Sequence, residues 1–377
     1  MPNYSVEFAE SIEDIGLDTW QRIAGYDYPF MRYEFFQALE SSGSVSKERG
    51  WYPQHLVFED KQAADSIKSV MPMYLKSHSW GEYVFDWAWA DAYQRAQLHY
   101  YPKLVATIPF TPTPSDKLLS NTVDYRQIFS YLIAHCQQQP ISSWHLLFCP
   151  ELDIAGVDDV YQRHTVQFLW FNRQYQSFDH YLQSFTARKR KNTRKERLAI
   201  QKQGIEIRRV AVAQITASEL EFFYLTYQLT YMRRGHTPHL TLDFFKQVFT
   251  AMADNILLII ASKHQKDIAS ALFFYDQNQL FGRYWGCTEQ VDCLHFELCY
   301  YQGIEFCIEQ NLQSFNPGTQ GEHKLQRGFE PTLTHSYHWI KHPQFKSAIA
   351  DFCLLEQRQM HQYQQQCWQK LPFKNRE

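Results

Sequence analysis

Glycine is scarce in this sequence, and its cysteines are not spaced for metal binding. The 377 residues include 14 Gly, too few for a chain built on glycine-rich loops. No two cysteines form a Cys-x-x-Cys pair, so the spacing of a zinc site is absent and we expect no bound metal. We instead expect reduced, structural thiols buried in the core, at positions 136, 149, 287, 293, 299, 307, 353 and 367.

Long apolar runs are also missing. The longest, residues 256–261, is short enough for a buried strand, whereas a membrane span needs roughly 18 apolar residues. The first residues show neither the basic nor the apolar region of a signal peptide. A net charge of −3 gives no global attraction to nucleic acid. We therefore expect a cytoplasmic protein with no membrane span and no DNA partner.

The length predicts two domains, because one hydrophobic core rarely extends beyond roughly 250–300 residues. Aromatic residues make up 16% of the chain, enough to fill large cores. We place the domains at residues 1–174 and 175–377, the second ending in a polar, Gln-rich helix.

Hydrophobic periodicity predicts an α/β (α+β) fold in which helices and strands alternate. In the first domain we expect strands at 55–59, 69–76, 82–86, 143–148 and 165–171, and helices at 29–40, 88–98 and 125–138. In the second we expect strands at 205–210, 256–261, 268–275, 279–285 and 314–316, and helices at 181–204, 218–233, 242–255, 294–310 and 345–369. The helix at 294–310 joins the last two strands, which should therefore be parallel.

Several segments are typical of one bacterial family. They are PMYLKSHS from Pro72, GEYVFD from Gly81, YYPKL from Tyr100, GRYWG from Gly282, LHFE from Leu294, and PGTQGEHK from Pro317 followed by RGF from Arg327. Together they resemble the predicted N-acyltransferases labelled peptidoglycan biosynthesis/recognition proteins. That FemAB-like family is similar to the Fem-type aminoacyl transferases and lies within the GNAT acyltransferase superfamily.

The resemblance covers nearly the whole chain and implies a fold and a reaction. The fold is two tandem GNAT-like domains with mixed central sheets flanked by helices. The reaction is direct attack of a primary amine on an acyl or aminoacyl donor, with no tightly bound cofactor. The donor stays open among acyl-CoA, acyl carrier protein and aminoacyl-tRNA. The alternatives are an aminoacyl-tRNA-dependent peptidoglycan-type transferase, or a non-catalytic GNAT-fold module that binds a cell-wall precursor or acyl carrier protein. Nothing in the sequence indicates an oligomeric state.

Two places in the second domain carry candidate catalytic residues. Glu297 begins the helix at 294–310 on an apolar stripe, where it would act as a base or hold an ammonium group. Its alternative role is a helix N-terminal charge favoured by the dipole. Glu322 and His323 follow closely spaced glycines and supply a further base, and Lys324 and Arg327 beside them would bind anions. Their alternative is an ordinary charged surface turn.

Three further segments are candidates for binding substrates. Arg283 and Gly286 match the GNAT turn that cradles donor phosphates, although acidic residues follow at 289 and 292. In the first domain, Lys76, His78 and Asp86 form either an acceptor-binding wall or an ordinary hairpin turn. The run from 188 to 197 is cationic at seven of ten positions, which indicates a solvated helix or an anchor for donor phosphates.

Overall fold

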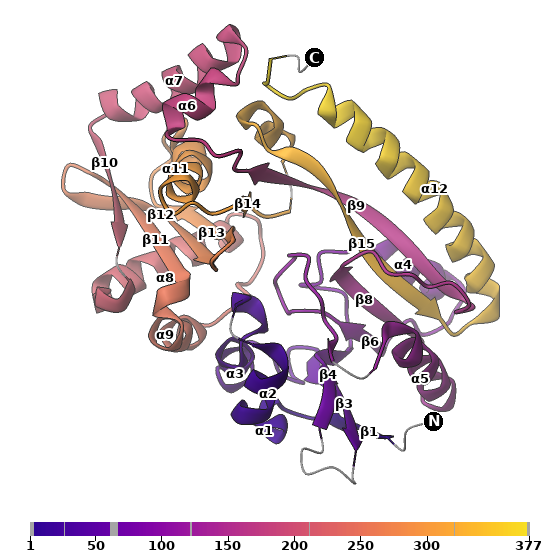
Figure 1. The fold of residues 1–377 in the computed structure, drawn as a ribbon. Helices are drawn as coiled ribbons and strands as arrows, with labels where there is room; N and C mark the ends of the chain where they lie inside the picture. The colour runs from indigo at the N-terminus through magenta and orange to yellow at the C-terminus, as the bar shows by residue number, and fades with distance from the viewer. Residues whose placement is uncertain are drawn as a thin grey trace. The chain divides into compact units, whose positions relative to one another are not determined.

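The computed structural model describes residues 4–25, 27–60, 67–120, 123–210, 212–319 and 321–374 (Figure 1). Gln320, part of the predicted Glu-His-Lys segment, lies outside these residues. The chain forms two compact units: unit 1 holds Met1–Tyr26, Phe30–Val166 and Leu333–Tyr363, and unit 2 holds Asp27–Pro29, Gln167–Thr332 and Gln364–Glu377. The sequence predicts a single domain boundary after residue 174, whereas each compact unit consists of three separate segments of the chain.

Residues 333–363 belong to unit 1 because of strand pairing. Strand β15 (Glu330–Ile340) pairs antiparallel with β8 (Ser143–Cys149), so that His338 lies opposite His145. Helix α12 (Pro343–Trp368) follows at once and packs its buried residues Ile349 and Cys353 with Trp89. Strand β15 was not predicted from the sequence, because residues on both of its faces are buried.

Unit 1 contains two sheets. The smaller has the order β1-β3-β4-β7 and is antiparallel: β1 (Tyr4–Ala9), β3 (His55–Asp60), β4 (Ile67–Met71) and β7 (Leu119–Ser120). The larger has the order β15-β8-β6-β5-β2, with β6 (Lys103–Ala106) parallel to β8, and it includes β5 (Met73–Lys76) and β2 (Trp51–Pro53). The helices of unit 1 are α1 (Ile12–Ile15), α2 (Leu17–Ala24), α3 (Tyr33–Ser41), α4 (Trp87–Arg95), α5 (Tyr125–Gln138) and α12.

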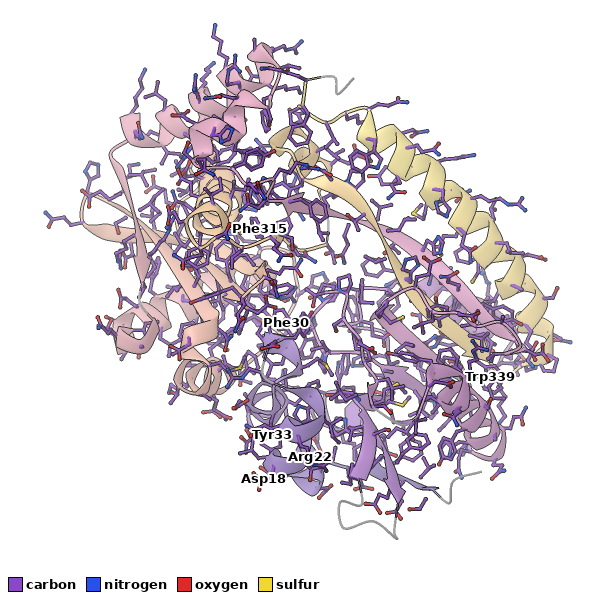
Figure 2. The ribbon with its side chains drawn as sticks, viewed as in Figure 1. Asp18, Arg22, Phe30, Tyr33, Phe315 and Trp339 are labelled. Carbon is purple, nitrogen blue, oxygen red and sulfur yellow. The ribbon has the colours of Figure 1, made fainter. Side chains whose placement is uncertain are left out.

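The core of unit 1 lies on one face of the larger sheet. Phe129 of α5 stacks on Trp144 at 4.8 Å between ring centroids, and Trp339 of β15 joins the same cluster. Trp339 and, in unit 2, Phe315 are enclosed core side chains (Figure 2). The predicted strand at 82–86 is wrong. This segment is irregular because the carboxylates of Glu82 and Asp86 both bind Lys103.

Unit 2 has strands in the order β10-β11-β12-β13-β14-β9. They are β10 (Ile205–Val210), β11 (Ile256–Lys263), β12 (Lys266–Tyr275), β13 (Gln279–Cys287), β14 (Ser314–Asn316) and β9 (Val160–Phe171), which begins in unit 1. Among the described strands of unit 2, β13 and β14 are the pair that runs parallel, which confirms the prediction for these two strands. Its helices are α6 (Phe178–Gln183), α7 (Ala187–Lys202), α8 (Ala217–Met232), α9 (Leu242–Ala251), α10 (Leu294–Phe296) and α11 (Gln302–Glu309).

Two predicted helices of unit 2 are divided. The helix predicted at 181–204 is two helices, because Ser177 caps α6 with its side chain and a separate start follows at Ala187. The helix predicted at 294–310 contains a π-helical turn, η4 (Glu297–Tyr301), between α10 and α11. Turns of this type are rare and often mark functional sites. Each unit is thus a mixed sheet flanked by helices, which confirms the α/β class.

Candidate functional site

Strands β13 and β14 separate soon after they meet. Their parallel pairing covers three residue pairs and ends at Phe281 opposite Asn316. The chain then turns at Pro317 and Gly318, and no strand among the described residues pairs with the rest of β13 on that side. Strand pairing on this side of β13 therefore ends at Phe281.

The Glu-His-Lys segment lies next to this separation. Residues Glu322–Arg327 form a 3₁₀ helix, η5. Lys324 is 2% exposed, and its Nζ donates a hydrogen bond of 2.6 Å to the carbonyl oxygen of Gly318. Burial lowers the pKa of Lys324 to about 7. Lys324 therefore points its amino group at the turn that ends the pairing of β13 with β14.

His323 makes a contact suited to proton transfer. Its Nε2 lies 2.7 Å from the hydroxyl oxygen of Tyr300, which η4 supplies. Burial and the charges of Lys324 and Arg327 lower the pKa of His323, so its imidazole is neutral at pH 7. A neutral imidazole can accept a proton. The geometry thus supports a base at His323.

The surroundings of His295 show that this corner of unit 2 is electropositive. The ring of His295 lies 6.0 Å from that of His323. Burial lowers its pKa to about 4, and the positive charges of Lys324, Arg327 and Arg234 act in the same direction. An anionic ligand would reduce this repulsion.

Arg327 and Glu297 are engaged within the fold. Both terminal nitrogens of Arg327 are used, one by the carboxylate of Glu196 at 2.8 Å and one by the carbonyl oxygen of His323 at 2.7 Å. Glu297 is 3% exposed and receives hydrogen bonds on both oxygens from Arg197. The ion pair of Glu297 with Arg197 thus ties α7 to η4.

Glu322 lies apart from the other predicted catalytic residues. It is exposed, and its ion pair with Lys370 spans 3.4 Å between two side chains that are each more than half exposed. Exposed pairs of this kind contribute little to stability. The structure therefore places His323 beside Tyr300 and Lys324 against Gly318, and Glu297 and Glu322 make other contacts.

The two predicted donor-binding residues of β13 make close contacts within unit 2. The guanidinium of Arg283 lies 5.5 Å from the ring centroid of Tyr284. A Cβ atom on Gly286 would come within 1.9 Å of the carbonyl oxygen of Thr226 in α8. Glycine at this position is thus explained by the close approach of α8 to β13.

Gly286→Ala should therefore lower the free energy of unfolding by about 1–3 kcal/mol, the usual cost of overpacking a filled contact. Gly282→Ala is the matched control on the same strand, because its new Cβ would meet its nearest atom at 3.3 Å. Urea unfolding followed by circular dichroism measures both. Equal losses in the two variants would contradict this account of Gly286.

Unit 1 carries a second group of chemically active residues, on the face of the larger sheet opposite Trp144. Strand register places Lys76 of β5 opposite Lys103 of β6, and His145 of β8 opposite His338 of β15. All four side chains are at most 1% exposed. Burying charges and imidazoles costs free energy that apolar residues would not cost. A buried polar row of this kind is typical of function rather than of stability.

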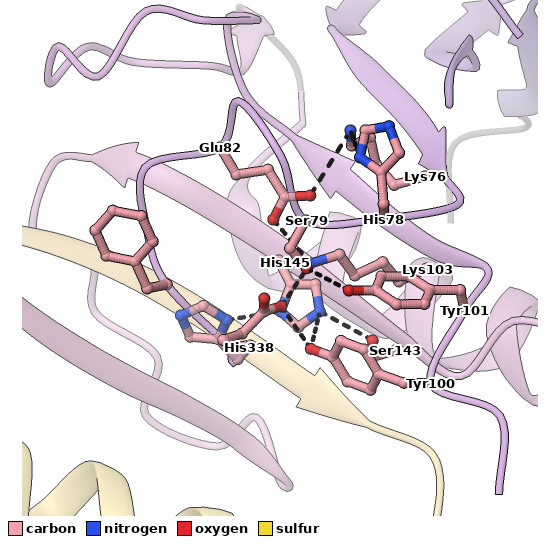
Figure 3. Close-up of polar contacts among 12 residues, drawn as sticks. Lys76, His78, Ser79, Glu82, Tyr100, Tyr101, Lys103, Ser143, His145 and His338 are labelled. Atoms are coloured by element: carbon pink, nitrogen blue, oxygen red, sulfur yellow. Dashed lines mark hydrogen bonds and ion pairs between the residues drawn. The ribbon is translucent and has the colours of Figure 1, made fainter. Parts of the chain in front are cut away.

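Lys103 is the centre of this network (Figure 3). Its Nζ donates hydrogen bonds of 2.7 Å to Glu82, 2.5 Å to Asp86 and 2.8 Å to Ser79. Asp86 also accepts a hydrogen bond of 2.6 Å from Tyr100. Burial opposes these contacts, but Lys103 and its hydrogen bond still hold the pKa of Asp86 below its usual range.

The other end of the network is a histidine pair. Nδ1 of His145 lies 2.7 Å from Nδ1 of His338, so one nitrogen carries the hydrogen and the other accepts it. Burial holds the pKa of both rings well below the ordinary value. Ser143 and Ser336 contact the outer nitrogens at 2.9 Å and 2.8 Å.

Lys76 and His78 lie at the edge of the network. Nζ of Lys76 is 3.4 Å from the ring centroid of Trp51 and 3.9 Å from Glu82 Oε1. Burial lowers the pKa of Lys76 to about 6 and raises that of Glu82 to about 7. His78 is half-buried, with Nε2 2.9 Å from the carbonyl oxygen of Arg49. The predicted Lys76, His78 and Asp86 thus do lie in one region.

The sequence-based list of site residues omits Lys103, Glu82 and the two histidines. A signal was present in Ser143-Trp144-His145 and Ser336-Tyr337-His338, where polar and aromatic residues alternate as in a strand. The pattern predicts a polar face but not that the face is buried. Among the described residues, no group of His, Cys, Asp and Glu could hold a metal ion, and no helix is long and apolar enough to cross a membrane.

Three solved structures have a similar fold. A conserved protein of unknown function from Bacteroides thetaiotaomicron is 11% identical, with a TM-score of 0.53 over 89% of this chain and 100% of that one. The C-terminal DUF2156 domain of a putative lysylphosphatidylglycerol synthetase from Agrobacterium fabrum is 7% identical, with a TM-score of 0.53 over 90% and 95%. FemX is 11% identical, with a TM-score of 0.48 over 82% and 93%. No curated protein matches the chain.

The sequence profile of one family matches residues 11–375, which is nearly the whole chain. Its description is peptidoglycan biosynthesis/recognition, and it is the family to which the quoted segments are similar. The predicted α/β class with mixed sheets and flanking helices is confirmed, and the tandem GNAT-like arrangement stays a prediction. The chain belongs to the FemAB-like family.

Proposed function

We propose that this protein is a cytoplasmic N-acyltransferase, which moves an acyl or aminoacyl group from an activated donor to a primary amine by direct attack. The observation that carries the proposal is the separation of β13 from β14 beside Lys324 and His323. Acyl transfer needs backbone donors for the reacting carbonyl, cations for an anionic donor and a base for the amine. In this proposal, the part of β13 beyond its pairing with β14 supplies the backbone donors, and η5 with Tyr300 supplies the cation and the base.

His323 is the base in this proposal. The attacking amine forms a bond to the carbonyl carbon and becomes positively charged. Nε2 of His323 takes its proton, directly or through the hydroxyl of Tyr300 at 2.7 Å. The tetrahedral intermediate then expels the donor's leaving group. Glu297 and Glu322 remain predicted alternatives for the base, and Arg283, Gly286 and Arg327 remain predicted contacts for the donor.

The donor is proposed to be anionic, as acyl-CoA or an aminoacyl-tRNA is. Helix α7 exposes Arg188, Lys191 and Lys195 to solvent, which favours a polyanion over a neutral ester. Arg197, in contrast, is occupied by Glu297 and Glu305. On the acceptor side, we propose contacts from Lys76, His78 and Asp86.

The test is transfer of a labelled acyl group to a panel of amines, with acetyl-CoA and with aminoacyl-tRNA as donors, read by mass spectrometry. Lys324→Met should raise the KM for the productive donor roughly 10- to 100-fold, because it removes a charged hydrogen-bond donor. Lys246→Met, on the exposed surface of α9, is the matched control. An acylated protein in the absence of amine would contradict direct attack, and a normal KM for Lys324→Met would contradict the donor site.

A further inference from the structure

The buried network of unit 1 leaves two acceptor atoms unused. Glu82 Oε1 and Asp86 Oδ1 are buried and have no hydrogen-bond partner, although the second oxygen of each carboxylate binds Lys103. A buried carboxylate oxygen without a donor costs free energy comparable to a lost hydrogen bond, and more because it is charged. Both side chains are 3% exposed. Two buried acceptor atoms without donors are typical of a binding site in which a ligand supplies the missing hydrogen bonds.

The charges of the network determine which ligand would fit. Lys103 is a single ammonium group shared by two carboxylates. Lys76 lies near Glu82 Oε1, but at 3.9 Å it makes no hydrogen bond, and burial disfavours its charged form. The unused positions are therefore acceptors in a region of negative charge. A cation with several N–H donors satisfies them, and an anion does not.

Aromatic rings surround the same place. The face of Trp51 lies 3.4 Å from Nζ of Lys76, a position that suits any ammonium group. The covering segment, residues 77–87, turns Glu82 and Asp86 inward and leaves Trp80 51% and Phe85 55% exposed. Nζ of Lys76 donates a hydrogen bond of 3.3 Å to the carbonyl oxygen of Trp80, so the segment 77–87 lies directly against Lys76. An entering ligand would thus pass exposed aromatic rings before it reaches buried carboxylates.

From this arrangement we infer that unit 1 holds a binding site for a primary alkylamine, whose ammonium group is bound by Glu82 with Asp86 beneath the segment 77–87. The alkyl part lies against the exposed rings of Trp80 and Phe85. Because Nζ of Lys76 has no exposed surface, the turn from Ser77 to Gly81 must move for the amine to enter. The inference rests on the proposed function only in that it gives the acceptor side its chemical class.

The test is isothermal titration of the full chain with hexylamine at pH 7, with no donor present. Hexanol, which has the same chain and no charge, is the ligand control. Glu82→Gln should weaken hexylamine binding at least about tenfold, because it removes the buried charge that the ammonium faces. Glu48→Gln, an exposed glutamate of unit 1, should bind hexylamine as the unsubstituted protein does.

A second variant should change the affinity for hexylamine in the opposite direction. Lys76→Met removes an amino group that lies 3.9 Å from Glu82 Oε1 and over the face of Trp51, so it should tighten hexylamine binding several-fold. It also keeps the inference testable if Glu82→Gln does not fold. Binding of hexanol as tight as hexylamine, or weaker hexylamine binding by Lys76→Met, would overturn the inference. Hexylamine binding without any acyl transfer would instead count against the proposed function alone.

Discussion

Lys103→Met should lower the free energy of unfolding by about 3–5 kcal/mol, the usual effect of removing one partner from a buried ion pair. Lys103 has no exposed surface, and its ammonium group is the hydrogen-bond donor that Glu82 and Asp86 share. Without it, two carboxylates would face each other in a buried site. Urea unfolding at pH 7 measures the loss. Lys47→Met, the same change on an exposed side chain of unit 1, should cost less than about 0.5 kcal/mol.

The pH dependence of this loss provides a further check. In the Lys103→Met variant the folded-state pKa values of Glu82 and Asp86 rise, because burial disfavours their charged forms and no cation compensates. A raised carboxyl pKa costs stability as pH rises through the unfolded value, so the deficit should shrink as pH falls toward 5. Adding Glu82→Gln and Asp86→Asn should restore most of the stability at pH 7. A loss that neither acid nor these two substitutions relieve would contradict the ion-pair explanation.

His323→Ala should lower kcat roughly 100- to 10,000-fold with the donor and amine that support turnover, since that is the usual contribution of a positioned base. The neutral imidazole beside Tyr300 would be lost while the rest of η5 stays in place. Steady-state kinetics measures the effect. His264→Ala, an exposed histidine between β11 and β12, is the control and should keep the original kcat.

The pH profile separates a base from a structural residue. The pKa of His323 lies below its ordinary value of 6.5, so kcat at saturating donor should stay constant near pH 7 and fall only below 6.5, where the imidazole gains a proton. Tyr300→Phe should reduce kcat less than His323→Ala does, because it removes the relay but not the base. A His323→Ala enzyme with nearly full kcat would move the role of base to Glu297 or Glu322.

Local pattern was sufficient for the elements whose environment is uniform. The short strand at Ser314–Asn316 and the strand at Ile205–Val210 were predicted at their observed bounds. The apolar strand that begins at Ile256 was predicted two residues shorter than observed. In these segments apolar residues face a core, so the period of the sequence reports the structure directly. The motif at η5 was likewise found from its residue types, although Gly321 and Gly328, at φ of +118° and +79°, enclose a 3₁₀ helix rather than a turn.

The unit 1 network was not predictable in the same way. Lys103 and His145 come from strands 40 residues apart along the chain, and His338 comes from a strand almost 200 residues further on. Their partnership depends on the register of β6, β8 and β15, which is a long-range property. The predicted domain boundary also placed residues 333–363 in the second domain, whereas they belong to unit 1.

The sequence by itself determined the α/β class, the family and the residue types available for chemistry, because these follow from local periodicity and from quoted segments. Only the tertiary structure decided which charges are already neutralised: Arg197 holds Glu297, Arg327 holds Glu196, and Lys103 holds two carboxylates. The physical reason is that an ionisable side chain has no fixed chemistry of its own. Burial and the charges within a few ångströms set its pKa and its contacts, and those neighbours come from distant parts of the chain.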